Sequence, residues 1–239
     1  MSDKKGSCLL CGKPLVYFDA ARKAECVFCH GVFETNALCV DGHYVCDRCH
    51  AEKGTDAIMR RCLESRSDNP AEILFGIMED PFIYMHGPEH HIMVGAALLT
   101  AWKNAGGEGE LKSMLEEMKR RGSRYPGGSC GFWGCCGAAV SAGMFFSIIT
   151  KTTPLSEASW GQGNMLTSLA LGEIAKTGGP RCCKRNSFSA VKTAVKFVNE
   201  TLGVSMKLPD KIVCRFSSNN KECLGSRCPY NKNHTETGI

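Results

Sequence analysis

The sequence predicts a mainly α protein, in which a helical domain is preceded by a small zinc-binding module. Three observations predict this architecture. Cysteines at metal-ligand spacing fill the first part of the chain, apolar residues recur at helical spacing through most of the remainder, and proline and glycine breaks divide that remainder into segments of helix length. We expect a double zinc-binding module over residues 1–53 and a helical cysteine-rich domain over residues 54–239.

The first element is the cysteine-rich module, whose ligands follow the order C-x2-C, C-x2-C and C-x3-H-x2-C-x2-C. Two cysteines separated by two residues can turn back in a tight knuckle and present both sulfurs to one tetrahedral ion. Eight ligands make two complete sites, so we predict two zinc ions bound by Cys8, Cys11, Cys26, Cys29, Cys39, His43, Cys46 and Cys49. The sites fill either sequentially or interleaved as a cross-brace, and His30 and His50 are alternative ligands.

The module is too short to build a core without help, and zinc in such modules contributes about 10 to 16 kcal/mol of apparent folding free energy. We expect Gly12 and Gly31 to take the positive φ angles of its cysteine knuckles. Closed tetrahedral sites leave no position for a substrate, which favours a structural role. Seven Lys and Arg balance seven Asp and Glu over residues 1–53, a poor footprint for phosphate. Contact with protein is therefore favoured over contact with nucleic acid.

Four helices are predicted next from their caps and apolar spacing. A Thr-Asp pair opens a helix over residues 55–66, and an Asn-Pro pair opens one over residues 70–78. Proline near the first turn, an acidic residue beside it and recurring apolar positions predict a third helix over residues 88–104. Leucines and a methionine at helical spacing predict the fourth over residues 110–121.

The stretch of residues 125–150 carries no charge and has to be tested as a membrane span. Its first part is rich in glycine and cysteine, which leaves an apolar part shorter than the roughly 20 residues that a bilayer requires. We therefore predict a buried helix over residues 133–149 and no contact with a membrane. Another amphipathic helix is predicted over residues 156–177, where a Gly-Gly-Pro sequence ends it.

The last helix is expected to begin at a serine cap, Ser187 or Ser189, and to end at Gly203. Only residues 211–216 are predicted as a strand. The sequence contains no G-x-G-x-x-G dinucleotide loop, no phosphate-binding P-loop and no serine-nucleophile elbow, which argues against those enzyme classes.

The second domain carries its own set of cysteines, grouped in four places: Cys130, the pair Cys135 and Cys136, the pair Cys182 and Cys183, and the group Cys214, Cys223 and Cys228. Several stand at predicted helix ends, where the helix dipole favours the thiolate. A cysteine directly before proline, as at Cys228, recurs at iron–sulfur ligands. We predict an iron–sulfur cluster, of the [4Fe–4S] type, with ligands drawn from Cys130, Cys135, Cys182, Cys223 and Cys228. A thiol site without iron and incidental buried cysteines are the alternatives.

Catalysis would then fall to free thiols and to nearby histidines. The candidate thiols are Cys135, Cys136, Cys182 and Cys183. The candidate histidines are His86, His90 and His91, as cluster neighbours, metal ligands or general bases. Residues 175–239 carry twelve Lys and Arg against four Asp and Glu, which favours an anionic substrate or partner.

Four segments carry a resemblance to a known family: MHGPEHHIMVGAALLTAWKNAGG, GGSCGFWGCCGAAVSAG, GGPRCCKR and CRFSSNNKECLGSRCPY, preceded by CVDGHYVCDRCH. The chain resembles a cysteine-rich family of unknown function from anaerobic archaea and bacteria, whose members are sometimes fused behind SAM-dependent methyltransferase domains. The resemblance covers most of the chain and brings no established reaction. More loosely, residues 136–142 resemble the C-G-A-x-x-G helix of helical redox proteins, with Ser141 where that pattern has glycine.

The N-terminus shows no apolar segment or cleavage signature, so we expect a cytoplasmic protein. In a reducing cytosol, clustered thiols are metal ligands or redox groups more often than disulfides. We therefore predict an iron–sulfur or thiol-dependent enzyme of redox or group-transfer chemistry, acting on a small anionic substrate or a partner protein. The alternatives are a non-catalytic zinc-binding adaptor that contacts protein or nucleic acid, and RNA-directed sulfur transfer.

Overall fold

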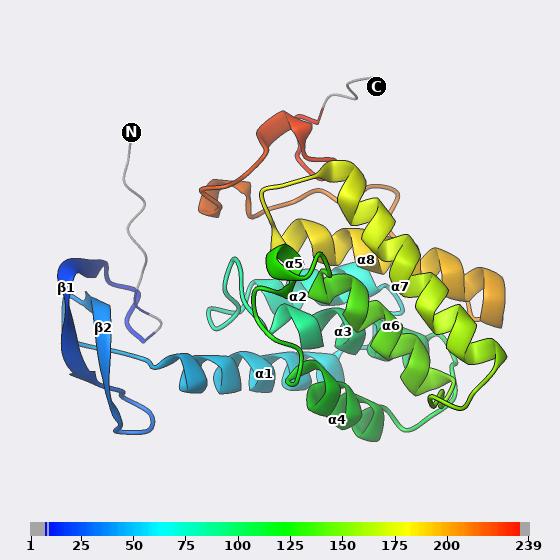
Figure 1. Ribbon diagram of the computed structural model, residues 1–239, viewed down its shortest axis with the longest axis horizontal. Helices are drawn as coiled ribbons and strands as arrows, with labels where there is room; N and C mark the ends of the chain where they lie inside the picture. The colour runs from blue at the N-terminus through cyan, green and yellow to red at the C-terminus, as the bar shows by residue number, and fades with distance from the viewer. Residues whose placement is uncertain (1–7, 9, 235–239) are drawn as a thin grey trace. The chain divides into compact units, whose positions relative to one another are not determined.

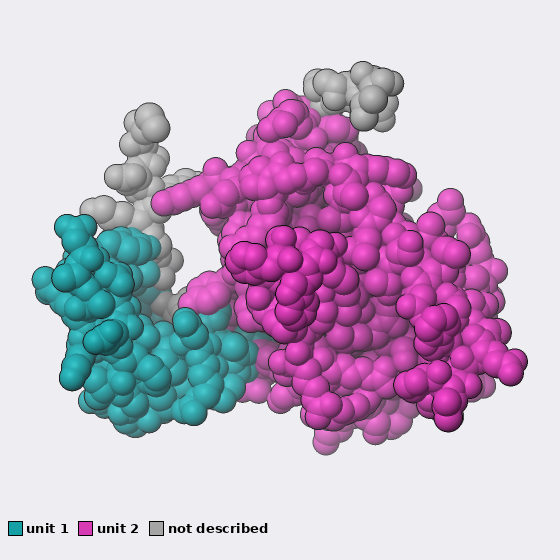
Figure 2. All heavy atoms as spheres, in the orientation of Figure 1, with its two compact units in different colours: residues 1–54 teal, residues 55–239 magenta. Residues whose placement is uncertain are grey.

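The computed structural model describes Cys8 and residues 10–234. The chain divides into two compact units, Met1–Gly54 and Thr55–Ile239, which Figure 2 shows in different colours. We call them the N-terminal unit and the helical unit. Over the described residues the chain forms eight α-helices and a single two-stranded sheet, which confirms the predicted mainly α class. No described helix has both the length and the apolar character needed to cross a bilayer.

The N-terminal unit is built on an antiparallel hairpin of β1 (Leu15–Glu25) and β2 (Val32–Cys39). An irregularity interrupts the register between Tyr17 and Arg22. The sequence analysis did not predict these strands, because most of their side chains are exposed on both faces and no apolar alternation marks them. A lone two-stranded hairpin is marginal in water, so it depends on what the cysteines at its ends hold.

Helix α1 (Asp47–Glu64) begins well before the predicted start at Thr55. The helix runs through Gly54, since a glycine costs an internal helical position only about 1 kcal/mol relative to alanine. The earlier start places Cys49 and His50 on the first turns of a helix.

The helical unit is arranged around one buried helix. Its other helices after α1 are α2 (Pro70–Met78), α3 (His90–Asn104), α4 (Leu111–Gly122), α5 (Ser129–Phe132), α6 (Gly137–Ile149), α7 (Ala158–Thr177) and α8 (Cys183–Leu202). Most residues of α3 are buried, because it packs against α2, α4, α6 and α8 (Figure 1). Helix α7 packs against α6 and α8, and Leu166 and Ala170 are its only fully buried residues.

One close approach fixes how α3 crosses α6. A Cβ on Gly95 would overlap the sulfur of Met118 and would lie 3.0 Å from the carbonyl oxygen of Ser141. The Gly95 amide donates a 2.8 Å hydrogen bond to the Ser141 hydroxyl at the same point. Only glycine allows the two helices to approach this closely.

One helix starts at its predicted cap, and a second has a cap that was not predicted. The side-chain oxygen of Asn69 accepts from the amides of Ala71 and Glu72 at the start of α2. Glu110 caps α4 in the same way. Helix α6 begins later than predicted, because a separate short α5 and Gly134 at φ +64° precede it.

The start of α8 differs from the prediction. It begins at Cys183 and its N-cap is Cys182, whose sulfur accepts from the amide of Arg185 at 3.5 Å. A thiol is not among the usual capping groups, so the serines further on were chosen instead. Ser187 and Ser189 are buried inside the helix.

The predicted strand over residues 211–216 is wrong, because the segment has no strand to pair with along its length. Within the described residues, the chain after α8 forms two short 3-10 turns, η1 (Ser217–Asn219) and η2 (Gly225–Arg227). The amide of Cys214 donates to the carbonyl of Tyr230 at 2.7 Å, which closes the segment into a loop.

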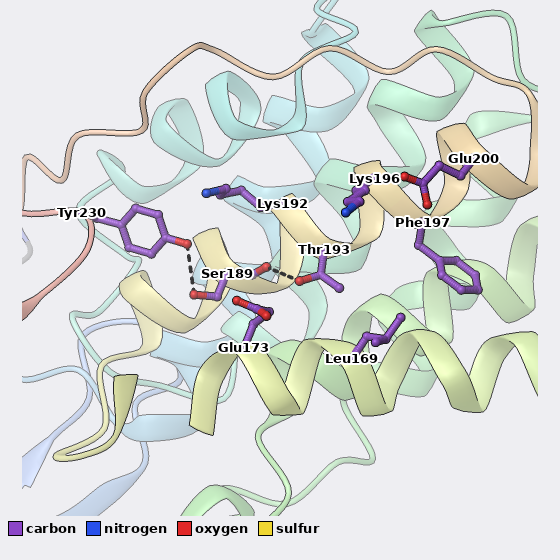
Figure 3. Close-up of a pocket in the computed structure, with 9 residues that line it drawn as sticks. All are labelled: Leu169, Glu173, Ser189, Lys192, Thr193, Lys196, Phe197, Glu200 and Tyr230. Carbon is purple, nitrogen blue, oxygen red and sulfur yellow. Dashed lines mark hydrogen bonds between the residues drawn. The ribbon is translucent and has the colours of Figure 1, made fainter. Parts of the chain in front are cut away.

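Tyr230 fastens this loop to α8. Its hydroxyl lies 3.0 Å from that of Ser189, across the shallow pocket between α7 and α8 shown in Figure 3. The Tyr230 ring also meets the buried Phe188 edge to face. The C-terminal cysteines are therefore anchored against the first half of α8.

Candidate functional site

The N-terminal unit brings its eight predicted ligands together in two groups of four. The members of each group offer ligand atoms that all lie within 4.8 Å of one another, and each group could hold a metal ion. One group is Cys8, Cys11, Cys39 and His43, and the other is Cys26, Cys29, Cys46 and Cys49. The knuckle of Cys8 and Cys11 is thus grouped with Cys39 and His43. The knuckle of Cys26 and Cys29 is grouped with Cys46 and Cys49. Of the two arrangements left open by the spacing, the structure has the interleaved cross-brace.

The distances within each group suit a tetrahedral ion. The sulfurs of Cys11 and Cys39 lie 3.5 Å apart, and those of Cys29 and Cys46 lie 3.7 Å apart. Two thiolates bound at about 2.3 Å to one tetrahedral ion would be about 3.8 Å apart, whereas a disulfide bond is about 2.05 Å long. None of the sixteen cysteines, all within the described part of the chain, is in a disulfide.

A positive φ angle was predicted at one glycine in each cysteine knuckle, and the structure has it in the first knuckle only. Gly12 has φ +72°, as predicted, and its amide bonds back to the carbonyl of Cys8. In the second knuckle, His30 takes the positive φ, at 56°, while Gly31 does not. Gly31 is needed for space, because a Cβ there would lie 2.8 Å from the ring of Phe33. His30 is exposed and pairs with a glutamate, and neither His30 nor His50 belongs to a metal group.

Charge in the two groups is arranged for a cation. Burial acts to raise the pKa of Cys8, but backbone N–H donors, including that of Leu10, outweigh it and lower the pKa to about 6. The pKa of Cys26 is likewise lowered to about 6 against burial, chiefly by the amide of Cys46. Burial and the sulfurs around it raise the pKa of Cys49 to about 12. Further thiolates in one group therefore require a positive ion between them.

In the helical unit, a different set of cysteines surrounds one enclosed cavity. The cysteines lining it are Cys182, Cys214, Cys223 and Cys228. The rest of the wall is formed by Met85, Arg185, Ser217, Asn220, Leu224 and Tyr230. The room between these atoms for the centre of a water-sized probe is about 10 Å³. We call it the four-cysteine cavity.

The sulfurs of the four-cysteine cavity do not form a compact group like those of the N-terminal unit. Within the described residues, the groups of three or more ligand atoms lying within 4.8 Å of one another are confined to the N-terminal unit. No three of the four cavity sulfurs therefore lie within 4.8 Å of one another.

Hydrogen-bond donors already point at the cavity sulfurs. The amide of Phe216 donates to Cys214 at 3.4 Å, and that of Gly225 donates to Cys223 at 3.4 Å. The side-chain amide of Asn220 donates to Cys182 at 3.6 Å. Such N–H···S bonds stabilise thiolates and set the potential of a cluster.

His86 holds Asn220 in place. The Cys183 amide donates to His86 Nδ1 at 3.4 Å, so the ring proton is on Nε2, which lies 3.2 Å from the side-chain oxygen of Asn220. That oxygen also accepts from the amide of Glu222, which leaves the Asn220 nitrogen facing Cys182. His86 is thus a second neighbour of the four-cysteine cavity.

A buried cation lies beside the same cavity. Lys184 is 2% exposed, and its ammonium has no hydrogen-bond partner among the described residues. Burial lowers its pKa to about 8, while the carboxylate of Glu89 and the sulfurs of Cys183, Cys182 and Cys214 act in the opposite direction. The ammonium also lies 5.0 Å from the centroid of the Phe216 ring. Because a buried ammonium is costly, negative charge in the cavity would stabilise it further.

The other predicted catalytic histidines lie elsewhere in the helical unit. His90 is 1% exposed, its Nδ1 donates to the carbonyl of Gly87 at 3.1 Å, and burial lowers its pKa. His91 packs edge to face on Tyr125, and its Nδ1 lies 3.1 Å from the Tyr125 carbonyl oxygen. Burial lowers the pKa of His91 as well.

The remaining predicted cysteines do not reach the four-cysteine cavity. Cys130 and Cys136 line a larger, separate cavity. The carbonyl of Cys135 accepts from the Tyr125 hydroxyl, and Cys183 is buried enough to raise its pKa to about 11.

Sequence reasoning missed Cys214, Asn220 and Lys184 at the four-cysteine cavity. Cys214 stood in the C-terminal group but had no spacing signal, and Lys184 was counted only as part of the basic region. The one available signal was the pairing of Cys182 with a lysine two residues later inside a predicted turn.

Comparison with known proteins gives one family. The model of a family of unknown function, DUF5714, matches residues 58–231. The match covers all four cysteines of the cavity and none of the ligands in the N-terminal unit. No curated protein and no solved structure matches the chain.

Proposed function

The chain belongs to DUF5714, a family of unknown function, and because the family names no reaction we propose from the site itself that the helical unit is an iron–sulfur protein. Its cluster ligands are Cys182, Cys214, Cys223 and Cys228. A bound cluster supplies one-electron transfer. The function is therefore redox or group-transfer chemistry, with the protein's own side chains setting the environment of the cluster.

The observation that carries this proposal is the pairing of four cysteines with a buried cation. The ammonium of Lys184 is buried near Cys182 and Cys214 and lacks a hydrogen-bond partner in the described structure. It lies over the ring of Phe216, and the carboxylate of Glu89 attracts it. Thiolates around iron carry net negative charge, which would stabilise the ammonium further.

The N-terminal unit has a different task in this proposal. Its two groups hold one zinc ion each, because zinc prefers tetrahedral sites of cysteine and histidine. All four positions of each ion are taken by protein, so the ions stabilise the hairpin and take no part in catalysis. Free thiols throughout the chain support a reducing compartment, the cytoplasm.

Metal analysis of protein never exposed to air tests the proposal. We expect iron and acid-labile sulfide, a visible absorption band and two zinc ions per chain. Cys214→Ala and Cys228→Ala should lose iron and keep both zinc ions. Cys62→Ala and Cys130→Ala are matched controls that should keep iron and both zinc ions, because neither side chain lines the four-cysteine cavity. A colourless wild-type protein with zinc alone would favour a zinc-binding adaptor instead.

The charge argument has its own test. Lys184→Met keeps the length of the side chain and removes the ammonium. We expect it to bind iron less tightly than the wild type and to be more stable than the wild type when both lack the cluster. Equal iron content and equal stability would remove the basis for pairing Lys184 with the cluster.

A further inference from the structure

A second cavity lies among residues of α5, α6, α7 and α8 and of the segments next to them, and two cysteines line it. It is lined by Cys130, Gly131, Gly134, Cys136, Leu171, Gly172, Ile174, Ala175, Gly178, Gly179, Arg181, Arg185 and Asn186. Its volume is about 740 Å³ by the measure used for the four-cysteine cavity. We call it the thiol cavity. Arg185 lines both cavities, which makes them neighbours.

Glycines keep the thiol cavity open. A Cβ built on Gly131, Gly172 or Gly179 would meet no atom within 4 Å. None of the three has a positive φ, so neither backbone conformation nor packing requires glycine at these positions. Gly172 even lies inside α7, where glycine weakens the helix. The space beside these glycines is therefore free for a ligand.

The two arginines of the cavity have different parts. Arg185 is 3% exposed, and its guanidinium donates to the carbonyls of Gly178 and Pro180 at 2.8 and 3.0 Å. It therefore positions the wall between α7 and α8. Arg181 is exposed at the rim, so its charge is available to an anion.

One thiol of the cavity is prepared to react. Cys136 is the N-cap of α6, a helix of 13 residues, so its sulfur lies at the positive end of the helix dipole. The buried Asn186 donates a hydrogen bond from its side-chain amide to the Cys136 sulfur at 3.3 Å. The wall of the cavity therefore holds this sulfur in place, and Cys136 is partly exposed to the cavity.

From these observations we infer that the thiol cavity is a substrate site for a small organic anion carrying an electrophilic atom, and that Cys136 is its nucleophile. The anionic group pairs with Arg181, and the body of the molecule rests against Leu171 and Ile174. The Cys136 thiol gives its proton to solvent, its sulfur forms a bond to the electrophilic atom, and the leaving group departs with the electron pair of the broken bond. No external electron donor is needed for this step.

Two alkylating reagents of almost equal size test the charge preference. Iodoacetate is an anion and iodoacetamide is neutral, and each alkylates a thiolate with loss of iodide. The full-length protein, with its metals bound, is treated briefly with either reagent, and modification of each cysteine is followed by peptide mass spectrometry. Arg181→Gln should slow iodoacetate at Cys136 by about fivefold, the effect of one nearby charge in water, and leave iodoacetamide almost unchanged. Arg66→Gln, an exposed arginine outside both cavities, is the control.

Filling the cavity is the second arm of the test. Gly172→Leu places a side chain in the open space and should slow both reagents at Cys136 by roughly tenfold, since the reacting group can no longer be positioned. Gly161→Leu is the matched control, because Gly161 lies in the same helix, has nothing within 4 Å of its Cβ position and does not line the cavity. Its rates should equal those of the wild type.

The inference is overturned if Arg181→Gln slows both reagents equally, if Gly172→Leu has no effect, or if Cys130 is alkylated in preference to Cys136. It stands apart from the iron–sulfur proposal, since Gly172→Leu should keep the wild-type iron content. A variant that loses alkylation and keeps iron supports the thiol cavity alone. Loss of iron in Cys214→Ala with unchanged alkylation supports the cluster alone.

Discussion

The side-chain nitrogen of Asn220 lies 3.6 Å from the sulfur of Cys182 and donates a hydrogen bond to it across 38 residues of sequence. Asn220→Asp keeps the oxygen that accepts from Glu222 but replaces the donor and adds negative charge. Both changes oppose the addition of an electron, so the midpoint potential of the cluster should become more negative. An anaerobic redox titration followed by absorption measures it. Asn219→Asp, at the neighbouring exposed residue, should shift the potential far less; equal shifts would contradict a role for this bond.

The interleaved arrangement of the N-terminal unit predicts an unequal outcome for two double variants. Cys11→Ala with Cys39→Ala damages one group and should leave one zinc ion per chain. Cys11→Ala with Cys26→Ala damages both groups and should leave none. Sequential sites would give the opposite result, because Cys11 and Cys26 would then share an ion. Zinc analysis of the two purified variants, each beside the wild type, distinguishes the arrangements.

Cys62 predicts a pH dependence of stability. Its thiol is fully buried, and burial raises its pKa from 9.0 to about 12, with the side chain of Thr100 acting in the opposite direction. In the unfolded chain the thiol ionises near pH 9 while the folded protein keeps it neutral, so stability falls as pH rises from 9 to 12. The loss approaches about 4 kcal/mol at the upper end. Urea unfolding of the wild type and Cys62→Ala at several pH values measures this contribution of Cys62 to stability. If the free energy of unfolding fell equally with pH in both proteins, the raised pKa of Cys62 would be contradicted.

The crossing of α3 and α6 predicts a difference between two Gly-to-Ala variants. Gly95→Ala forces a methyl group against Met118 and the Ser141 carbonyl, and should destabilise the protein by about 1–3 kcal/mol. Gly161→Ala lies in a helix with open space at its Cβ position and should stabilise it by up to about 1 kcal/mol. Thermal unfolding, followed by the fluorescence of Trp102 and the other tryptophans, measures the change in stability of each variant. A stable Gly95→Ala would show that the helices can separate at low cost.

The elements that the sequence predicted well are those with a local cause. Asn69 followed by proline is a complete helix start, and the structure uses it. Ligand spacing in the N-terminal unit identified every member of both metal groups for the same reason, since two cysteines in a knuckle depend only on the residues between them.

The features that could not be predicted depend on contacts between distant residues. Spacing could not choose the cross-brace, because that choice is made by a hairpin whose strands carry little apolar alternation. Cys214 joins Cys182 only because Tyr230 fastens the loop to α8 through Ser189, a contact over 41 residues. The start of α8 was misplaced because a thiol caps it in place of a hydroxyl.

The cross-brace has a consequence for how the N-terminal unit takes up metal. The ion held by Cys11 and Cys39 closes a loop that contains the whole second knuckle, with 28 positions separating those two ligands. Once that loop is closed, the remaining ligands have less chain entropy to lose when they meet the second ion. Zinc uptake should therefore be cooperative, with chains carrying a single ion scarce at half saturation. The unit would respond to zinc concentration as a threshold rather than as two independent binding curves.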